Sequence, residues 1–296
     1  LIGTPPNGIF ARFVEQTYGV SVNFLDWMKI SVPVIGVMIV ITYLLMTKVL
    51  FREQIEALPG GKEWVKAEYA KLGPMSRGEK IVLTVFVTAA LLWCFGPVIR
   101  SLEIGGMTPF KPLSDTVIAM AAGIILFIIP VDYKKGIHAL DWSSASETVA
   151  WDVLLLFGGG LSMAAAIQST GLADIIGAQA VALSALPEAA VMGGITTIAV
   201  FASEFTSNTA LAATMMPLVS AIAQSINMHP EPLLMCTTFG ASLAFMMPVG
   251  TPPNAIIFGT GRIRIGEMIR AGFWLNVCGI VVSTVMCLVI DVGIIQ

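Results

Sequence analysis

A five-residue motif, Gly-Thr-Pro-Pro-Asn, occurs twice in this chain, at residues 3–7 and at residues 250–254. Each copy combines a hydroxyl and a carboxamide with two prolines, which interrupt an α-helix because proline lacks a backbone N–H. A further polar group, Ser207-Asn208-Thr209, lies in a stretch whose one charged residue is Glu204 (residues 189–228). Neutral oxygens can coordinate a hard cation, and hydroxyls and carboxamides can also donate to an anion. The pattern therefore indicates a binding site for small ions.

The elements that hold these groups belong to a membrane protein. The 296 residues are 56% hydrophobic and 12% charged, whereas a soluble domain has about 25% charged residues. A membrane-spanning helix needs about 20 apolar residues. We expect an all-α polytopic membrane protein with spans near residues 30–50, 80–99, 113–131, 151–173 and 267–290.

Charge distribution gives an orientation and excludes some functions. The polar stretch 51–80 carries six Lys/Arg residues, which predicts a cytoplasmic position under the positive-inside rule. No basic patch indicates nucleic acid as a partner. The four cysteines lack metal-ligand spacing, and no histidine falls in an expected span. The chain is therefore expected not to be an enzyme.

The duplicated motif predicts an internal repeat. Each copy is followed by a basic residue and a span of about 20 residues, and the two copies are expected to run in opposite directions. Inverted repeats with broken helices are typical of secondary transporters, whose binding sites lie at the membrane midplane. We expect residues 1–50 to end the first repeat, residues 51–80 to form a linker and residues 81–296 to form the second repeat. The second repeat would contain a re-entrant hairpin (187–230), a broken helix (231–262) and a last span (266–291).

Broken helices leave free backbone groups at membrane depth, which is tolerated where they line a cavity or pack within protein. The N-terminus of a half-helix presents N–H groups that suit a carboxylate or sulfate. The C-terminus of a half-helix presents carbonyl oxygens that suit Na⁺. The two kinds of end could hold an anion and a cation side by side.

Three stretches resemble a known family, the divalent anion/sodium symporters. They are EFTSNTALAATMMP (204–217), ASLAFMMPVGTPPNAIIFG (241–259) and LLLFGGGLSMAAAIQSTGLA (154–173). The resemblance implies sodium-coupled transport of di- or tricarboxylates of the succinate, malate or citrate type by alternating access. It also implies a multi-pass protein of the bacterial inner membrane or plasma membrane, with Na⁺ and a small anion as ligands and a homodimer as the full-length form.

The same resemblance implies roles for particular residues. Substrate contacts are expected from Ser207, Asn208, Thr209, Thr251, Pro252, Thr4 and Pro5. Sodium contacts are expected from Ser203, Asn208, Gly250 and Gly3, with carbonyl oxygens supplied by Ser203 and the two glycines. The family has two Ser-Asn-Thr hairpins and this chain has one, so we interpret the sequence as a C-terminal fragment whose partner hairpin precedes Gly3 by roughly 40–50 residues in a longer protein.

Several alternatives stay open at this stage. The substrate could be sulfate, and a related broken-helix protein such as a Na⁺/H⁺ antiporter or an arsenite carrier is a second possibility. Glu204 could carry a proton or bind a cation, because acidic residues within membranes often do so. We favour the other interpretation, in which Glu204 is a hydrogen-bonded structural acid that holds the hairpin against a neighbour.

Overall fold

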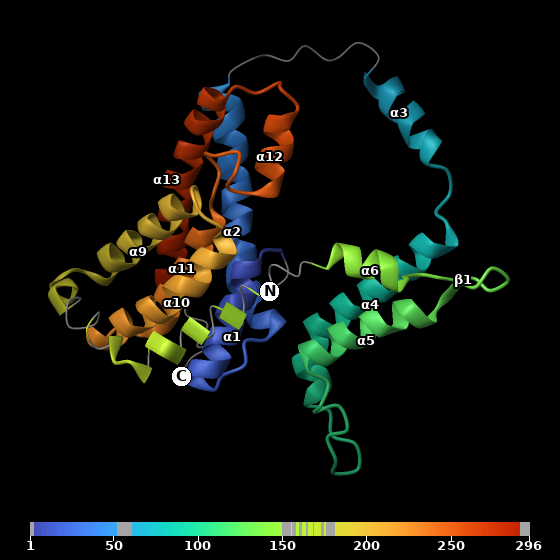
Figure 1. Cartoon of the computed structure of the whole chain (residues 1–296), viewed down its shortest axis with the longest axis horizontal. Coiled ribbons are helices and arrows are strands. Elements are labelled where there is room, and N and C mark those ends of the chain that lie inside the picture. The colour runs from blue at the N-terminus through green and yellow to red at the C-terminus, as the bar shows by residue number, and fades with distance from the viewer. Residues whose placement is uncertain are drawn as a thin grey trace. The chain divides into compact units, whose positions relative to one another are not determined.

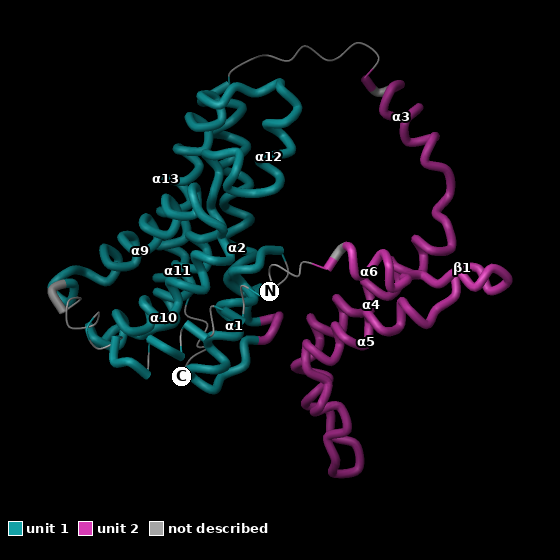
Figure 2. The backbone as a smooth tube through the Cα atoms, in the orientation of Figure 1, with its two compact units in different colours: residues 1–22, 26–52, 150–296 teal, residues 23–25, 53–149 magenta. Residues whose placement is uncertain are grey.

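The computed structural model describes residues 3–51, 61–149 and 181–290, with scattered positions between 155 and 175. Within these residues the regular elements are helices, apart from one short pair of strands. It forms two compact units (Figure 2): unit 1 contains residues 1–22, 26–52 and 150–296, and unit 2 contains residues 23–25 and 53–149. All the site residues predicted from the sequence belong to unit 1.

Unit 1 is a helical bundle built around α11 (Figure 1). α11 packs against α9 and α10, α13 packs against α9 and α11, and α1 packs against α10 and α11. Leu233, Leu234 and Cys236 of α11 have no exposed surface, in keeping with this central position. The elements of the unit are α1 (Pro5–Tyr18), α2 (Phe24–Leu44), the π-helical η1 (Leu45–Leu50), the 3-10 turn η2 (Val181–Ala185), α9 (Glu188–Ser203), α10 (Asn208–Ser225), α11 (Pro230–Ser242), α12 (Pro252–Gly259) and α13 (Ile265–Val289).

A glycine allows α11 to pack closely against α9. A Cβ added to Gly240 would lie 2.8 Å from the Cβ of Ala199 and 3.0 Å from the carbonyl oxygen of Thr196. Small residues at such crossings let helix backbones approach each other in membrane proteins, where dispersion contacts drive helix association. The position of α9, and of the hairpin tip that follows it, therefore depends on Gly240.

An aromatic group fixes α1 in the same bundle. The ring centroids of Phe10 and Trp27 lie 5.3 Å apart, and those of Trp27 and Phe239 lie 5.5 Å apart. Phe10 has no exposed surface and Trp27 is 2% exposed. These tilted contacts join α1, α2 and α11 and hold the helix that follows the first Gly-Thr-Pro-Pro-Asn copy.

Unit 2 is smaller and is built on the packing of α4 against α5. The strands pair antiparallel, with Pro130 opposite His138. The elements of the unit are α3 (Gly61–Leu72), α4 (Arg77–Arg100), α5 (Asp115–Ile128), β1 (Pro130–Asp132), β2 (Ile137–His138) and α6 (Trp142–Thr148).

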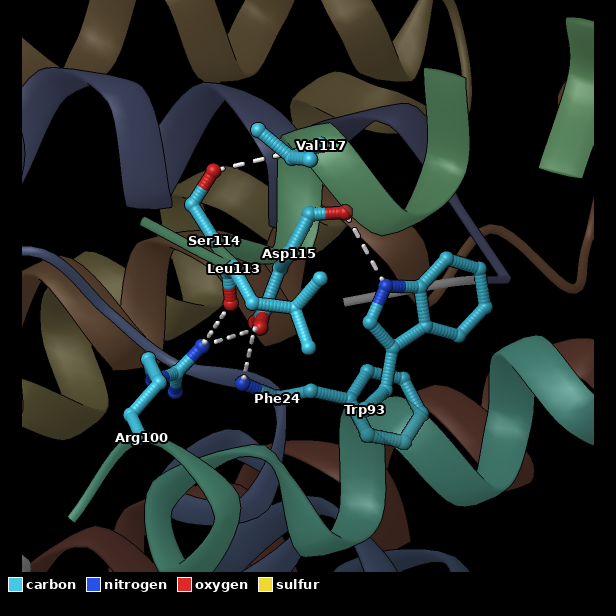
Figure 3. Close-up of polar contacts among 7 residues, drawn as sticks. All are labelled: Phe24, Trp93, Arg100, Leu113, Ser114, Asp115 and Val117. Atoms are coloured by element: carbon cyan, nitrogen blue, oxygen red, sulfur yellow. Dashed lines mark hydrogen bonds and ion pairs between the residues drawn. The ribbon is translucent and has the colours of Figure 1, made fainter. Parts of the chain in front are cut away.

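A polar cluster around Asp115 holds unit 2 together (Figure 3). The carboxylate of Asp115 accepts hydrogen bonds from Nη1 of Arg100 at 3.2 Å and from the backbone N–H of Phe24 at 3.0 Å. Arg100 also donates to the carbonyl oxygen of Leu113 at 3.0 Å, and Nε1 of Trp93 donates to the carbonyl oxygen of Asp115 at 3.0 Å. The cluster therefore joins the end of α4 to the start of α5 and to residues 23–25.

Three helices of the described chain are long and apolar enough to cross a membrane: Phe24–Leu50, Arg77–Arg100 and Ile265–Val289. They match the spans predicted near residues 30–50, 80–99 and 267–290, although the first begins six residues earlier. The span expected near 113–131 is a helix of 14 residues, because α5 starts after its N-cap Ser114 and ends ahead of Pro130. Most of the span expected at 151–173 lies outside the described residues.

Candidate functional site

The two Gly-Thr-Pro-Pro-Asn copies adopt the same local backbone. Thr4 precedes α1 with φ −146° and ψ 141°, and Thr251 precedes α12 with φ −145° and ψ 151°. Each threonine is extended because a residue before proline avoids the helical region. Each first proline then starts a helix, a position where its missing N–H costs nothing. The motif is therefore a helix start, whereas the sequence predicted only that its prolines interrupt a helix.

Neither threonine hydroxyl caps the helix that follows it. An N-cap side chain normally accepts from the N–H groups at the second and third helical positions. In both copies the first two helical positions are prolines, so two of the N–H groups expected at a helix start are absent. The hydroxyls of Thr4 and Thr251 are therefore not used for capping, and α1 and α12 offer an anion fewer N–H groups than we expected from the sequence.

The hairpin tip lies between α9 and α10. We predicted a turn at Ser207-Asn208-Thr209, but the non-helical tip is residues 204–207, and Asn208 and Thr209 form the start of α10. The start of α10 carries no proline, so it keeps its N–H groups, and the hydroxyl of its N-cap Ser207 makes no capping hydrogen bond. This helix N-terminus is better suited to an anion than the two proline-containing ones.

Asn208 carries the strongest local indication of a ligand. Its Oδ1 is buried and has no hydrogen-bond partner among the described residues. A buried, unpaired carboxamide oxygen is costly, and such an orphan atom calls for an explanation such as a bound ion. Ser203, at the end of α9, is fully buried and donates its hydroxyl hydrogen to the carbonyl oxygen of Val200 at 2.7 Å.

The predicted broken helix is interrupted where the second motif copy begins. α11 ends at Ser242 and α12 begins at Pro252, so residues 243–251 are non-helical. Asn254 stabilises this segment, because its Nδ2 donates to the carbonyl oxygens of Ala244 at 2.8 Å and Met247 at 3.1 Å. The backbone N–H of Gly250 also donates to the carbonyl oxygen of Met247 at 3.1 Å. The Asn of the motif thus folds back onto the break that precedes it.

Glu204 binds the opposite side of the same segment. Its carboxylate is 1% exposed and accepts from the backbone N–H groups of Phe245, Met246 and Met247 at 2.9 Å each. Nδ2 of Asn276, on α13, donates to the same carboxylate at 2.6 Å. This is the geometry of a hydrogen-bonded acid that holds the hairpin against a neighbour. Sequence reasoning missed Asn276, although an isolated Asn within an apolar span was a usable signal.

The first motif copy lies close to the end of α11, where the helix break begins. The hydroxyl of Ser242, at the end of α11, lies 3.5 Å from the hydroxyl of Thr4. Within the described part of the chain, no hydrogen bond joins Ser207, Asn208 or Thr209 to Gly250 or Thr251. Pro5, Pro252 and Gly3 are exposed. The structure therefore brings Thr4 close to the end of α11, whereas the assignment of the other site residues stays a prediction.

The groups near the hairpin tip and the helix break suit an alkali cation better than a transition metal. Among the described residues, no three His, Cys, Asp or Glu side chains are grouped so that they could hold a metal ion. The groups near the hairpin tip and the break are carboxamide, hydroxyl and carbonyl oxygens. Hard cations prefer such oxygen ligands.

These features define a class of protein: a multi-pass α-helical membrane protein in which a helix starts at each of two paired-proline motifs. Residues 1–292 match the family described as the sodium:sulfate symporter transmembrane region. The chain belongs to this family, which confirms the resemblance and the all-α polytopic fold expected from the sequence. It is an integral multi-pass protein of the plasma membrane.

Two relatives of this chain are described as sodium-dependent transporters. The chain is 37% identical to a sodium-dependent dicarboxylate transporter, SdcS, of Staphylococcus saprophyticus over 283 residues, which cover 95% of this chain and 54% of the relative. It is 38% identical to the SdcS of Staphylococcus aureus strain USA300 over 302 aligned positions, which cover 100% of this chain and 57% of the relative. The chain thus spans about half the length of the relatives it matches.

Proposed function

We propose that this chain provides part of the ion- and substrate-binding site of a sodium-coupled carrier for small dicarboxylates. The single observation that carries the proposal furthest is the buried Oδ1 of Asn208, which has no partner among the described residues. A sodium ion coordinated there would remove the cost of an unpaired buried oxygen. The C-terminal carbonyl oxygens of α9 and the carbonyl oxygen of Gly250 are the further ligands we propose, as the family resemblance implies.

The substrate would bind where hydroxyls and helix N–H groups meet without fixed positive charge. We propose that Ser207, Asn208 and Thr209 donate to one carboxylate at the start of α10, and that Thr251 and Pro252 line the pocket beside them. Thr4 and Pro5 would line the part of the pocket supplied by the first motif copy. Sodium bound nearby would offset the charge of the dianion as it crosses the membrane.

The geometry of Glu204 argues against the Na⁺/H⁺ antiporter alternative. An antiporter needs a carboxylate within the membrane that gains and loses a proton. Both oxygens of Glu204 already accept N–H donors from segment 245–247 or from Asn276, which favours a structural role for this carboxylate. A dicarboxylate is favoured over sulfate or arsenite because the relatives at 37% and 38% identity are described as dicarboxylate transporters.

Two further expectations belong to the same proposal. The carrier would act by alternating access without catalysing a chemical reaction, and the full-length protein would be a homodimer in the lipid bilayer. Sodium would enter as a transported ion rather than as a resident cofactor.

Uptake by proteoliposomes tests the proposal in a full-length carrier that contains this sequence. Radiolabelled succinate should accumulate with an inward Na⁺ gradient, with a Hill coefficient for Na⁺ above one, and should not accumulate with choline. Asn208→Ala should reduce this uptake at least 100-fold, because it removes the orphan oxygen. Thr206→Ala is the matched control, since Thr206 lies exposed at the same tip and its hydroxyl donates to the carbonyl oxygen of Ala202 in α9.

Each outcome decides between the alternatives. Equal succinate uptake in choline and in Na⁺ would refute sodium coupling. Stronger competition by sulfate than by malate or citrate would favour a sulfate symporter. Wild-type uptake by a folded Asn208→Ala protein would remove Asn208 from the site.

A further inference from the structure

One face of α13 packs directly against the non-helical segment 243–247. A Cβ added to Gly272 would lie 2.3 Å from the carbonyl oxygen of Phe245 and 2.5 Å from the Cα of Met246. A Cβ added to Gly279 would lie 2.8 Å from a methyl group of Leu243. Asn276 lies between these glycines at helical spacing, so all three positions share one face of α13.

The same segment meets Glu204 with three consecutive backbone N–H groups. Where α11 breaks, the N–H groups of Phe245, Met246 and Met247 are directed at a carboxylate instead of at helical carbonyl oxygens. Successive N–H groups that converge in this way form an anion-binding concavity. Asn276 completes it from α13. The carboxylate therefore satisfies three partly buried backbone donors, and leaving such donors unpaired is costly.

We infer that Glu204 and Asn276 are positioning residues that set the sodium affinity of the carrier by fixing the segment 243–250. Glu204 holds the N–H side of this segment, and Asn254 holds its carbonyl oxygens at Ala244 and Met247. Gly250 sits at the end of the segment, and a Cβ there would lie 3.0 Å from the Cβ of Ala244. Its carbonyl oxygen therefore depends on how the whole segment is held.

This positioning also explains why a charged residue lies in the otherwise uncharged stretch 189–228. Glu204 follows the last residue of α9 and precedes Asn208 by four positions. The contact with segment 245–247 thus ties the end of α9 and the start of α10 to the broken helix and to α13. The inference rests on the proposed sodium-coupled transport, since sodium affinity is the property it assigns to these residues.

Two substitutions disturb the segment from opposite sides. Glu204→Gln keeps the shape of the side chain but replaces an acceptor oxygen with an NH₂ group that faces N–H donors. Gly272→Ala leaves Glu204 intact and places a methyl group against the carbonyl oxygen of Phe245. The controls are Glu188→Gln, an exposed carboxylate on α9, and Gly266→Ala, where a Cβ on α13 meets nothing within 4 Å.

The readout is the Na⁺ concentration for half-maximal succinate uptake in a full-length carrier that contains this sequence. Glu204→Gln and Gly272→Ala should each raise this concentration at least tenfold. The succinate KM, measured at a Na⁺ concentration that saturates each variant, should change less than threefold, and both controls should stay within twofold of wild type. A purely structural role would lower the amount of folded protein and the maximal rate without this selective loss of Na⁺ affinity.

The outcomes separate this inference from the proposed function. Absence of Na⁺-driven uptake in the wild type would refute the proposed function before any variant is measured. If Glu204→Gln needs the same Na⁺ concentration for half-maximal uptake as the wild type, the inference is overturned and the proposed function still stands. If Glu204→Gln yields no folded protein, Gly272→Ala becomes the test of the inference. Half-maximal uptake at the same Na⁺ concentration in Gly272→Ala and Gly266→Ala would then overturn it.

Discussion

The two Gly-Thr-Pro-Pro-Asn copies have the same backbone but different surroundings. The helix that follows the first copy, α1, buries Ile9, Phe10, Phe13 and Val14, whereas α12 after the second copy has no buried residue within the described structure. α1 has 14 residues and α12 has 8. After each helix, five residues (19–23 and 260–264) lead to a long span. The repeat therefore extends from the motif to the span that follows it.

The difference shows that the motif fixes where a helix starts but not how the helix packs. In α1 the apolar residues fall on one face and Arg12 and Glu15 lie on the other, where they form an exposed ion pair. This amphipathic pattern buries one side. In α12 the apolar residues Ile256 and Ile257 are 71% and 48% exposed. The residues after the motif thus determine its burial.

The motif glycines also serve different purposes. Gly3 has a φ of 131°, a conformation that other residues rarely adopt. Gly250 has no such φ, but a Cβ there would approach the Cβ of Ala244 to 3.0 Å and the carbonyl oxygen of Met247 to 3.3 Å. One glycine is needed for its backbone angle and the other for space.

The largest expected difference between the copies is in stability. Phe10 and Ile257 each lie three residues after the motif Asn, and Phe10 has no exposed surface. Phe10→Ala should lower the free energy of unfolding by about 3–5 kcal/mol, because it leaves a cavity beside Trp27. Ile257→Ala should cost about 1 kcal/mol or less, since half of that side chain is already exposed.

Thermal unfolding of both variants in detergent, in a full-length carrier that contains this sequence, measures this difference. Equal losses would mean that α12 is as well packed as α1 and would remove the contrast. A larger loss for Ile257→Ala would reverse it.

A second, smaller effect concerns the motif Asn of the second copy. Asn254→Ala removes both hydrogen bonds to the carbonyl oxygens of Ala244 and Met247, at an expected cost of about 2 kcal/mol. Amide hydrogen exchange in residues 243–250 should then become about thirtyfold faster. Asn254→Asp should be at least as disruptive, because its oxygens would face two carbonyl oxygens.

Exchange measured by mass spectrometry tests the ordering of these variants. Thr260→Ala is a control that leaves the segment intact, since the hydroxyl of Thr260 hydrogen bonds to the carbonyl oxygen of Ile257. Unchanged exchange in Asn254→Asp would show that the segment does not depend on this side chain.

Much of the fold follows from local sequence signals. Uncharged stretches predict the membrane crossings, because crossings depend on hydropathy. The paired prolines predict the break between α11 and α12, because proline removes a backbone donor. The span expected at 113–131 was longer than the helix that forms, since Ser114 and Pro130 limit α5. The non-helical tip lies earlier in the chain than predicted, because Ser207 is extended and α10 already starts at Asn208 and Thr209.

The contacts at the break could not be predicted in the same way. Glu204, Met246 and Asn276 are far apart in the sequence, and their meeting depends on how α9 and α13 pack around α11. The presence of Glu204 in the otherwise uncharged stretch 189–228 did indicate a special role. Its partners are backbone N–H groups, which leave no mark in the sequence.

The smallest expected effect is the loss of the threonine hydroxyls. Thr4→Val and Thr251→Val should each change the free energy of unfolding by less than about 0.5 kcal/mol, because neither hydroxyl caps its helix. Valine also suits the extended backbone at both positions. An ordinary N-cap threonine is worth about 1 kcal/mol. A loss of that size in either variant would mean that the hydroxyl caps the helix after all.

Function and stability should separate at these two positions. If Thr4 and Thr251 line the substrate pocket, each valine variant should raise the succinate KM at least fivefold while thermal unfolding stays near that of the wild type. The Thr251 effect should be the larger, because the hydroxyl of Thr4 already lies 3.5 Å from that of Ser242 and is shared with it. The succinate KM of both variants, measured by uptake in a full-length carrier that contains this sequence, tests whether the two hydroxyls line the pocket. An unchanged KM in both variants would show that the motif starts a helix and does nothing more.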